Sequence, residues 1–369
     1  MRIERIDLLH VQLPLNEPYQ ISSGTLAEEH AIIVRLHSGG VVGYGESCPL
    51  FAPFYSYETT STAWYVLTEF LVPALLGQEV DSAESCLRLM DHVRGHNFAK
   101  AGPETAWWDL AGKLGSRSLA QMLGGQRSRV ESGLALGLEP RIEDLVAKAE
   151  RLLADGYRRL KIKITYGWDV EPVQALRRAL GNIPLMVDAN SAYRLEDVEI
   201  FRALDDYGLL MIEQPLHYED LLDHARLQRQ IKTPICLDES IHSLRHARDA
   251  VELGSCRIVN VKIQRVGGLA VAKAIHDLCH KAGIPLWVGT MPETGVGQAA
   301  GLALGSLPGF SYPTDVEPSL RFFRDDLVEP FIEMGRDGAI AVPTTPGIGY
   351  EVSEAKLAKY LVEERRFEA

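Results

Sequence analysis

Five charged residues recur along the middle of the chain at an almost constant spacing. They lie 25, 25, 25 and 24 residues apart and are Lys163, Asp188, Glu213, Asp238 and Lys262. Each of them ends a short apolar run, as Asp188 does in Leu185-Met-Val-Asp188. One strand and one helix of a parallel barrel together have about this length, and the carboxyl ends of barrel strands meet at one mouth. We therefore expect the five side chains to converge.

The three acids of this series, Asp188, Glu213 and Asp238, would repel one another unless protons or a metal ion lay between them. Carboxylate ligands without a nearby cysteine or histidine favour Mg²⁺, with Mn²⁺ as an alternative. A set of structural salt bridges is the competing interpretation, but burying so many charges without a function is costly. The pattern predicts a divalent-cation site with a lysine on either side.

Lysines that flank a metal-bound carboxylate suit the removal of a proton from the adjacent carbon. The resulting enediolate carries two negative charges, which a divalent cation stabilises. We expect Lys163 to be the base and Lys262 its partner on the opposite face. A lysine titrates near ~10.4, so a lysine base needs a lowered pKa, which a metal ion or the neighbouring ammonium of Lys161 would provide. Lys161 shares a strand face with Lys163 by periodicity. The second lysine either returns the proton, giving racemisation, or steadies the intermediate of an elimination.

The elements around these residues predict a parallel (β/α) barrel. Short apolar runs alternate with amphipathic helices from about residue 130, a pattern typical of parallel sheets covered by crossover helices. The runs are 132–137, 160–164, 184–187, 209–212, 235–237, 258–261 and 286–288. An open doubly wound sheet is the structural alternative, and the number and even spacing of the runs favour the barrel.

The first 125 residues show a different rhythm. Strand-like stretches at 6–13, 31–36 and 41–46 come first, with Gly39-Gly40 as the turn of a hairpin. Helical segments at 59–76 and 83–94 follow, which indicates an α+β unit.

Composition excludes several classes of protein. The net charge of −12 without a dense Lys/Arg block argues against a nucleic-acid partner. Five scattered cysteines without a CxxC pair argue against a disulfide framework or a zinc site. The chain has no apolar run long enough for a transmembrane helix, and its charged N-terminus is unlike a signal peptide. We expect a cytoplasmic protein without a membrane partner.

In its motifs the chain resembles the muconate-lactonising branch of the enolase superfamily, and within it the o-succinylbenzoate synthase and N-acylamino acid racemase family. The resemblance covers essentially the whole chain. It is carried by Lys161-Ile-Lys163, Asp188-Ala-Asn190, Ile212-Glu213-Gln214-Pro215, Asp238-Glu239-Ser240, Asn260-Val-Lys262 and Glu293-Thr-Gly295.

The resemblance implies a modified TIM barrel, (β/α)7β, over residues 126–320, with an α+β capping domain built from residues 1–125 and the C-terminal segment 321–369. It implies that Asp188, Glu213 and Asp238 bind Mg²⁺, that Lys163 and Lys262 are the acid and base, and that Asn190 and Glu239 orient the metal ligands. Specificity would come from capping segments 16–27 and 48–58, the second of which is rich in aromatic residues. The substrate contacts we expect are Lys161, Thr290, Met291, Glu293, Ala135, Phe51 and Tyr55.

The activity implied first is that of o-succinylbenzoate synthase, the dehydration of 2-succinyl-6-hydroxy-2,4-cyclohexadiene-1-carboxylate in menaquinone biosynthesis. The alternatives are racemisation of N-acylamino acids such as N-succinylamino acids, epimerisation of dipeptides, or a catalytically idle binding barrel. Several positions depart from the family pattern and leave the substrate open: Ala135, Thr290, Gln298, the pair Ile263-Gln264 and the stretch Asp315-Val316-Glu317. That acidic stretch is similar to the acidic pair with which dipeptide epimerases bind an amino group. We expect a small carboxylate substrate and a homo-oligomer.

Overall fold

A computed structural model describes residues 1–21 and 24–369 of the protein. Residues 22–23 belong to the predicted specificity segment 16–27 and lie outside the described residues. Across the described ranges, no helix has both the length and the apolar character that crossing a bilayer would require.

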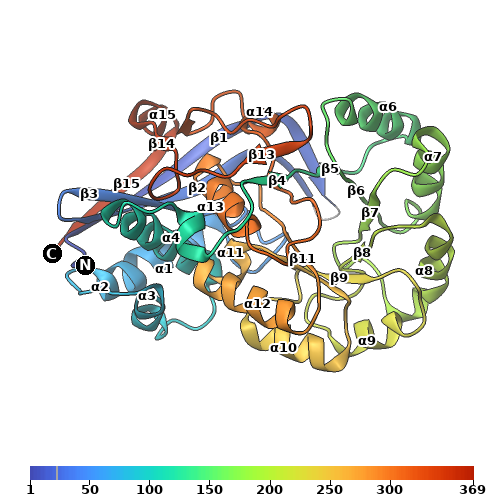
Figure 1. Ribbon diagram of the computed structural model, residues 1–369, viewed down its shortest axis with the longest axis horizontal. Coiled ribbons are helices and arrows are strands. Elements are labelled where there is room, and N and C mark those ends of the chain that lie inside the picture. Colours follow the sequence, from blue (N-terminus) through green and yellow to red (C-terminus); the bar gives the residue numbers. More distant parts are fainter. Residues whose placement is uncertain (22–23) are drawn as a thin grey trace.

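A parallel sheet of seven strands forms the centre of the larger half of the molecule (Figure 1). Its strands are β5 (Leu134–Leu136), β6 (Leu160–Lys163), β7 (Leu185–Asp188), β8 (Ile212–Glu213), β9 (Ile235–Leu237), β10 (Ile258–Val261) and β11 (Leu286–Val288). They pair in chain order, each with the next. A doubly wound sheet would reverse its order at a switch point, so the predicted barrel topology is confirmed.

The segment 310–316 closes this sheet between its two edges. Phe310 bridges Leu286 of β11, and Thr314 bridges Ser132 just before β5, both in the parallel sense. The N–H of Asp315 donates to the carbonyl of Val288 at 2.9 Å, and the N–H of Gly133 donates to Thr314 at 2.7 Å. This short segment therefore supplies the last strand of the (β/α)7β barrel.

Helices cover the outside of the barrel (Figure 1). They are α6 (Ile142–Leu153), α7 (Val170–Leu180), α8 (Val198–Leu204), α9 (Leu222–Gln228), α10 (Leu244–Leu253), α12 (Leu269–Lys281) and α13 (Gly295–Gly305). The short buried helix α11 (Ile263–Val266) lies instead at the mouth, directly after Lys262. Apolar residues that face outward from the strands, such as Leu185 and Val187 in β7, share the main core with these helices.

Inward-facing side chains of the strands lie in layers. One layer is a small apolar cluster that we call the barrel floor: Met186, Met211, Cys236, Ile258 and Trp287. The next inward position toward the carboxyl end of each of these strands carries a polar or charged residue or, after Trp287, a glycine. Lys161 and Lys163 both face the interior, as their spacing of two residues predicts.

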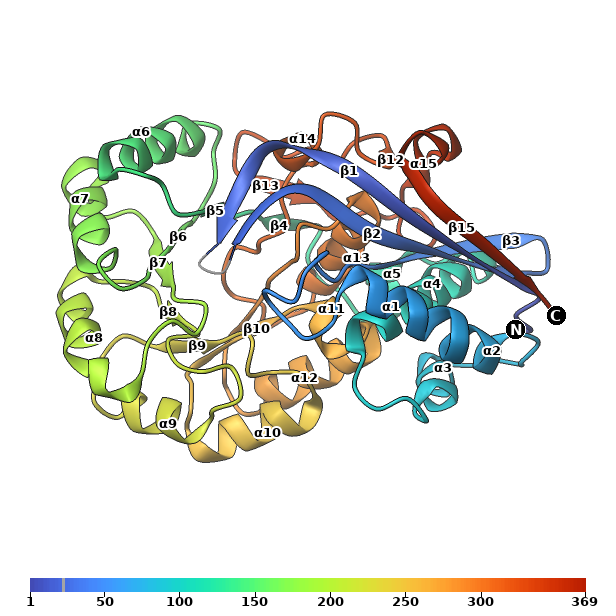
Figure 2. The same ribbon diagram turned by 180° about the vertical axis from the view of Figure 1, so that it is seen from behind.

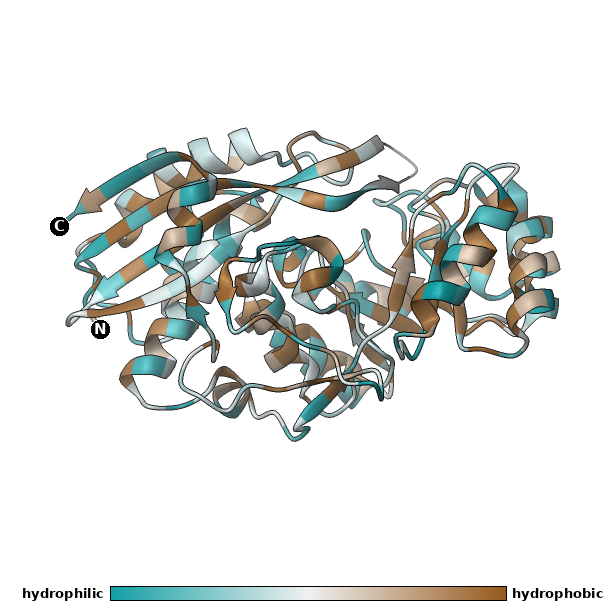
Figure 3. Ribbon diagram, turned by 90° about the horizontal axis from the view of Figure 1, so that it is seen from above, coloured by the Kyte–Doolittle hydropathy of each residue, from teal (hydrophilic) through white to brown (hydrophobic). Residues whose placement is uncertain are grey.

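The second part of the fold is a four-stranded antiparallel sheet in the order β15–β1–β2–β3. Its strands are β1 (Arg5–Ile21), β2 (Gly24–Ser38), β3 (Val41–Ser47) and β15 (Leu361–Glu368). Hydrophobic and hydrophilic residues alternate along these strands (Figure 3). Helices α1 (Thr60–Val66), α2 (Val72–Leu75), α3 (Ala83–Met90) and α4 (Asn97–Leu114) pack against its apolar face.

Both ends of the chain meet in this capping sheet. β15 pairs with β1, and the N–H of Ala369 donates to the carbonyl of Glu4 at 3.0 Å, so the termini lie side by side (Figures 1 and 2). The long β1–β2 hairpin reaches over the barrel (Figure 2). Segment 16–27, which we expected to be a loop, is thus the tip of a hairpin in its described part.

Shorter elements connect the two parts and follow the barrel. They are α5 (Leu119–Leu123), β4 (Arg129–Glu131), α14 (Ser319–Phe322), β12 (Val328–Glu329), β13 (Ala339–Ala341), β14 (Glu351–Val352) and α15 (Glu354–Tyr360).

Two buried carboxylates of the capping part hold the starts of barrel helices. Glu104 of α4 accepts the N–H groups of Leu269 and Ala270 at 2.7 and 2.9 Å, at the start of α12. Glu46 of β3 accepts from Thr294 and Gly297 at the start of α13. The first N–H groups of a helix lack partners within the helix and favour negative charge, so these contacts join the two parts.

We predict that Glu104→Ala lowers the free energy of unfolding by about 2–4 kcal/mol, because buried donors lose their acceptor. The donors are the N–H groups of Leu269 and Ala270 and the indole N–H of Trp108. Urea unfolding followed by circular dichroism measures the loss. Glu150→Ala, at an exposed position of α6, is the matched control; equal midpoints for the two variants would contradict the role of Glu104.

Candidate active site

The carboxyl ends of β6 to β10 bring the five regularly spaced residues to one mouth of the barrel. Lys163 Nζ lies 2.6 Å from Asp188 Oδ2, and Lys262 Nζ lies 2.9 Å from Asp238 Oδ2. Glu213 lies between these two pairs, beside Asp188 in the register of β7 and β8. All five side chains are less than one-tenth exposed. The structure therefore assembles the predicted residues in one buried cluster.

Lys161 is the centre of this cluster. Its Nζ lies 3.4 Å from Glu213 Oε2 and 3.9 Å from Asp188 Oδ2, and it also pairs with Asp315. Asp315 pairs in turn with Arg159 at 2.6 Å. Both cations lie 4.9 Å from the ring centre of Trp287 in the barrel floor. Arg159 and Asp315 thus join the site from below.

The carboxylates have the chemistry of a Mg²⁺ site. Asn260 Nδ2 donates to Glu213 Oε1 at 2.7 Å, and the N–H of Asn190 donates to Asp188 Oδ1 at 3.0 Å. The other oxygen of Glu213, Oε2, and Oδ2 of Asp238 are buried and have lysine ammonium groups as their charged neighbours. Three carboxylates at the ends of neighbouring strands, without sulfur or imidazole, fit a hard cation.

Across the part of the chain that the structure describes, no three acids, histidines or cysteines are already arranged as a metal cage. The physical reason is that lysine ammonium groups pair directly with these carboxylates. The predicted ligands Asp188, Glu213 and Asp238 therefore suit the cation in residue type and position. Ion pairs with lysines determine the orientation of their side chains.

The ion pairs determine which protonation states are favoured. Burial raises the pKa of Asp188. The ammonium groups of Lys163 and Lys161 lower it by a larger amount, so the pKa of Asp188 lies below its usual value. Burial lowers the pKa of Lys262, yet Tyr55 and the carboxylates of Glu213 and Glu239 raise it well above its usual value. The pKa of Lys161 is raised in the same way, chiefly by Asp315. For Lys161 and Lys262 the acids outweigh the neighbouring ammonium groups, so the protein groups alone do not lower the pKa of either lysine.

Asn190 and Glu239 lie beside the carboxylates, as the resemblance implies. Asn190 Nδ2 donates to Glu239 Oε1 at 2.9 Å. Gln214, which we did not assign to the site, holds the segment that carries Asp238. Its Oε1 accepts the N–H groups of Asp238 and Ser240 at 3.0 and 3.2 Å. Its positive φ of 38° directly after Glu213 is a feature that no residue type signals.

A cavity of about 90 Å³ opens onto the lysines. Five of the residues that we expected to contact substrate line it: Ala135, Lys161, Thr290, Met291 and Tyr55. Leu26 of the hairpin tip, Leu50 and Phe322 supply further apolar walls that we did not predict. Lys163 and Lys262 both line this cavity, so a bound molecule would lie between them.

Two predicted contacts are placed elsewhere. Phe51 is 46% exposed and packs against the rings of His30 and Phe54, because its backbone turns the side chain toward solvent. Glu293 is buried but does not line the cavity, and its Oε2 has no hydrogen-bond donor. Burial raises the pKa of Glu293, and the negative charge of nearby Glu46 adds to this increase. Aromatic character alone marked Phe51, and its neighbour Leu50 lines the cavity instead.

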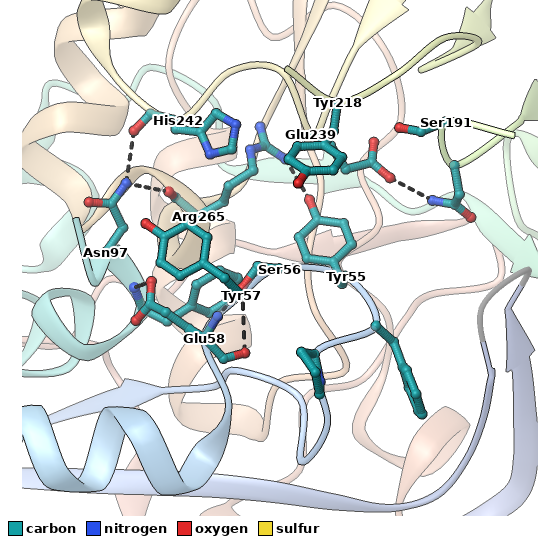
Figure 4. A pocket seen from close by; sticks show the side chains of 14 residues that line it. Tyr55, Ser56, Tyr57, Glu58, Asn97, Ser191, Tyr218, Glu239, His242 and Arg265 are labelled. Atoms are coloured by element: carbon teal, nitrogen blue, oxygen red, sulfur yellow. Dashed lines mark hydrogen bonds between the residues drawn. The ribbon is translucent and has the colours of Figure 1, made fainter. Parts of the chain in front are cut away.

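Tyr55 lines both this cavity and a second one of about 370 Å³, whose lining side chains are drawn in Figure 4. Its hydroxyl donates to Asp238 Oδ1 at 3.1 Å and accepts from Arg265 Nη1 at 3.0 Å. Its ring centre lies 4.5 Å from Lys262 Nζ. The capping segment 48–58 therefore reaches the cluster through one side chain.

Cationic side chains neutralise the acidic stretch Asp315-Val316-Glu317, which begins in the segment that closes the barrel. Arg159 and Lys161 lower the pKa of Asp315 despite its burial. Glu317 Oε2 lies 3.2 Å from Arg321 Nε and accepts from the hydroxyl of Tyr157 at 3.3 Å. Neither acid presents an uncompensated negative charge to the cavity.

Comparison with known proteins relates both parts of the chain to one family. Residues 144–356 match the enolase C-terminal domain-like family, and residues 4–124 match the mandelate racemase / muconate lactonizing enzyme N-terminal domain.

Individual relatives are similar over their whole length. An o-succinylbenzoate synthase of Geobacillus kaustophilus is 46% identical over 98% of this chain and 96% of its own. An N-succinylamino acid racemase of Thermus thermophilus is 44% identical over 95% and 94%. The crystal structure of a dipeptide epimerase from Cytophaga hutchinsonii, complexed with Mg and the dipeptide D-Ala-L-Val, covers 99% of this chain and 100% of its own, with a TM-score of 0.92 and 26% identity.

Proposed function

The chain belongs to the mandelate racemase and muconate lactonizing enzyme family of the enolase superfamily, and we propose that it removes the proton beside a carboxylate with the help of Mg²⁺. It is a lyase or isomerase of this superfamily. One observation carries the proposal: Lys163 and Lys262 face a single cavity from the two sides of a row of three buried acids.

Asp188, Glu213 and Asp238 would hold the cation. When bound, it supplies positive charge that stabilises the developing enediolate. Asn260 and Asn190 orient two of these carboxylates by the hydrogen bonds given above. Partners of this kind commonly fix metal ligands and tune them.

The two lysines are placed for transfer of a proton on either face of the substrate. Lys163 ends β6, whereas Lys262 follows β10, four strands away around the sheet. A carbon held in the cavity would have an amine on each side. Each ammonium now pairs with a carboxylate, Lys163 with Asp188 and Lys262 with Asp238. The lysine that acts as base must lose its proton before it can accept another.

The reaction that we favour is the dehydration of 2-succinyl-6-hydroxy-2,4-cyclohexadiene-1-carboxylate. Lys163 takes the proton from the carbon beside the carboxylate and returns it to the departing hydroxyl group on the same face. A C–H and a C–O bond break, water leaves, and the ring becomes aromatic. Lys262 remains charged on the opposite face. Similarity to o-succinylbenzoate synthases supports this choice.

Racemisation of N-succinylamino acids is the second candidate, supported by the similar racemase and by the second lysine. One lysine would remove the α-proton, and the other would deliver a proton to the opposite face. Dipeptides are less favoured, because a free amino group needs an uncompensated acid. Asp315 and Glu317 are both already paired with cations.

Addition of Mg²⁺ to the metal-free protein should raise its melting temperature, because a ligand that binds only the folded state stabilises it. Glu213→Gln should abolish most of this increase, because it replaces a buried carboxylate in the centre of the row. Differential scanning calorimetry measures both. Glu219→Gln, at an exposed position in the following loop, should behave as wild type. An unchanged wild-type melting temperature at millimolar Mg²⁺ would argue against the cation site.

Lys163→Ala and Lys262→Ala should each lower turnover by about 10²–10⁴-fold, the range typical of a lost acid or base. Absorbance follows formation of the aromatic product, and NMR in D₂O follows deuterium entry into both enantiomers of an N-succinylamino acid. In racemisation each lysine variant should lose exchange from one enantiomer only.

Lys281→Ala, at the exposed last residue of α12, is the matched control. Wild-type enzyme that forms no aromatic product and exchanges no α-proton in the presence of Mg²⁺ would contradict the proposed chemistry.

A further inference from the structure

Gln264, one of the residues that depart from the family pattern, ties the capping sheet to the turn after Lys262. It is 1% exposed and lies in α11, two residues beyond Lys262. Its Nε2 donates to the carbonyl of Glu46 at 2.9 Å, and its Oε1 accepts the N–H of Cys48 at 3.1 Å. The side-chain amide thus pairs with the end of β3 much as a neighbouring strand would.

The pair of bonds requires a carboxamide of this length. A carboxylate could accept from Cys48 but could not donate to Glu46, and an apolar side chain could do neither. Either replacement would leave buried backbone groups without partners, which is costly. The two bonds run in opposite senses, so they fix both the distance and the rotation of the turn relative to β3.

The same end of β3 also holds the segment on the other side of the cavity. The carboxylate of Glu46 accepts the N–H of Thr294 at 3.0 Å, the hydroxyl of Thr294 at 2.6 Å and the N–H of Gly297 at 2.9 Å. Thr294 lies two residues after Pro292, which lines the cavity together with Met291. Residues 46–48 are therefore a joint between the capping sheet and two segments of the barrel mouth.

The two lysines differ in what surrounds their backbone. Lys163 is the last residue of β6, which is paired on both sides by barrel strands β5 and β7. Lys262 comes after the end of β10 and precedes α11, the helix that Gln264 ties to β3. A shift of the capping sheet would reach the turn of Lys262 directly through the bonds of Gln264, whereas strand pairing with β7 holds the backbone of Lys163.

We propose that Gln264 is a positioning residue for Lys262, which makes the position of this lysine depend on the docking of β3 while the barrel sets Lys163. The inference deepens the proposed function and rests on it for the catalytic role of Lys262. Its decisive measurement needs no substrate, so the two can fail separately.

Competitive labelling of the full-length protein with acetic anhydride tests the inference, with Lys262 and Lys163 quantified by mass spectrometry. In Gln264→Met the ion pair between Lys262 and Asp238 loosens, and the labelling ratio of Lys262 to Lys163 should rise at least about threefold. Lys163 is the internal control, because general loosening would raise both lysines together. An unchanged ratio, or equal increases, would overturn the proposal.

Gln228→Met is the matched control. Gln228 is also buried, and its carboxamide donates to Thr233 at 3.2 Å and accepts the N–H of Ile235 at 2.7 Å, within the barrel. Its loss removes the same two kinds of bond without touching β3. The labelling ratio should stay at the wild-type value, and a rise as large as that of Gln264→Met would overturn the specific role of Gln264.

Gln264→Glu keeps the test decisive if Gln264→Met does not fold. A protonated carboxyl group can donate to Glu46 and accept from Cys48, whereas a carboxylate can only accept. The labelling ratio relative to wild type should therefore be normal while this carboxyl group is protonated and should rise with pH as it ionises, which NMR of the labelled carboxyl carbon follows in parallel. A ratio that stays normal after the group has ionised would contradict the proposal.

Turnover gives a second readout that a purely structural role would not produce. The Lys262→Ala variant identifies the enantiomer whose exchange depends on Lys262. Gln264→Met should lower deuterium exchange into this enantiomer about tenfold and leave exchange into the other enantiomer nearly unchanged. Equal losses in both enantiomers would count against positioning. Absence of exchange in the wild-type enzyme would instead contradict the proposed racemisation, and labelling would still decide the role of Gln264.

Discussion

The cost of burying charge governs this structure. The acids, lysines and arginines at or just below one mouth of the barrel have almost no exposure to solvent, and each is tolerable only because an opposite charge lies close by, as Arg159 does beside Asp315 and Arg265 beside Asp238. The pairs are formed between strands, so neutrality fixes which side chains are neighbours. It also sets the protonation of the cluster, since the acids raise the pKa values of Lys161 and Lys262. A cation that engages these acids would change the charge balance that now holds the lysines protonated, which links metal binding to base strength.

The capping part is attached by polar contacts rather than by apolar packing alone. Glu104 and Glu46 satisfy the free N–H groups at the starts of α12 and α13, and Gln264 pairs with the backbone of β3. Such contacts have strict geometry, and buried polar groups are costly if they lose their partners. They therefore hold the cap in a defined position over the cavity. The same cap supplies Leu26, Leu50 and Tyr55 to the cavity wall, so the position of the cap also shapes the space available to a substrate.

Charge neutralisation also bears on the choice of substrate. From sequence, Asp315 and Glu317 form an acidic stretch that suits an amino group. In the structure Asp315 pairs with Lys161 of β6 and with Arg159, the residue before β6. Glu317 pairs with Arg321 of α14. Three lysines and several apolar residues line the cavity together with these two compensated acids. This combination suits an anionic substrate with an apolar body.

The sequence by itself determined the barrel, the five charged residues of its mouth and the inward direction of Lys161 and Lys163, because period and spacing repeat with each strand and helix. Local patterns of this kind survive in the linear chain. Tertiary structure alone decided how the charges pair, that segment 310–316 closes the sheet, and that Leu50 rather than Phe51 lines the cavity. It also decided that Gln264 binds β3, more than 200 residues earlier in the chain. Each of these features depends on the distance and orientation between residues far apart in sequence, and no residue type or spacing carries that information.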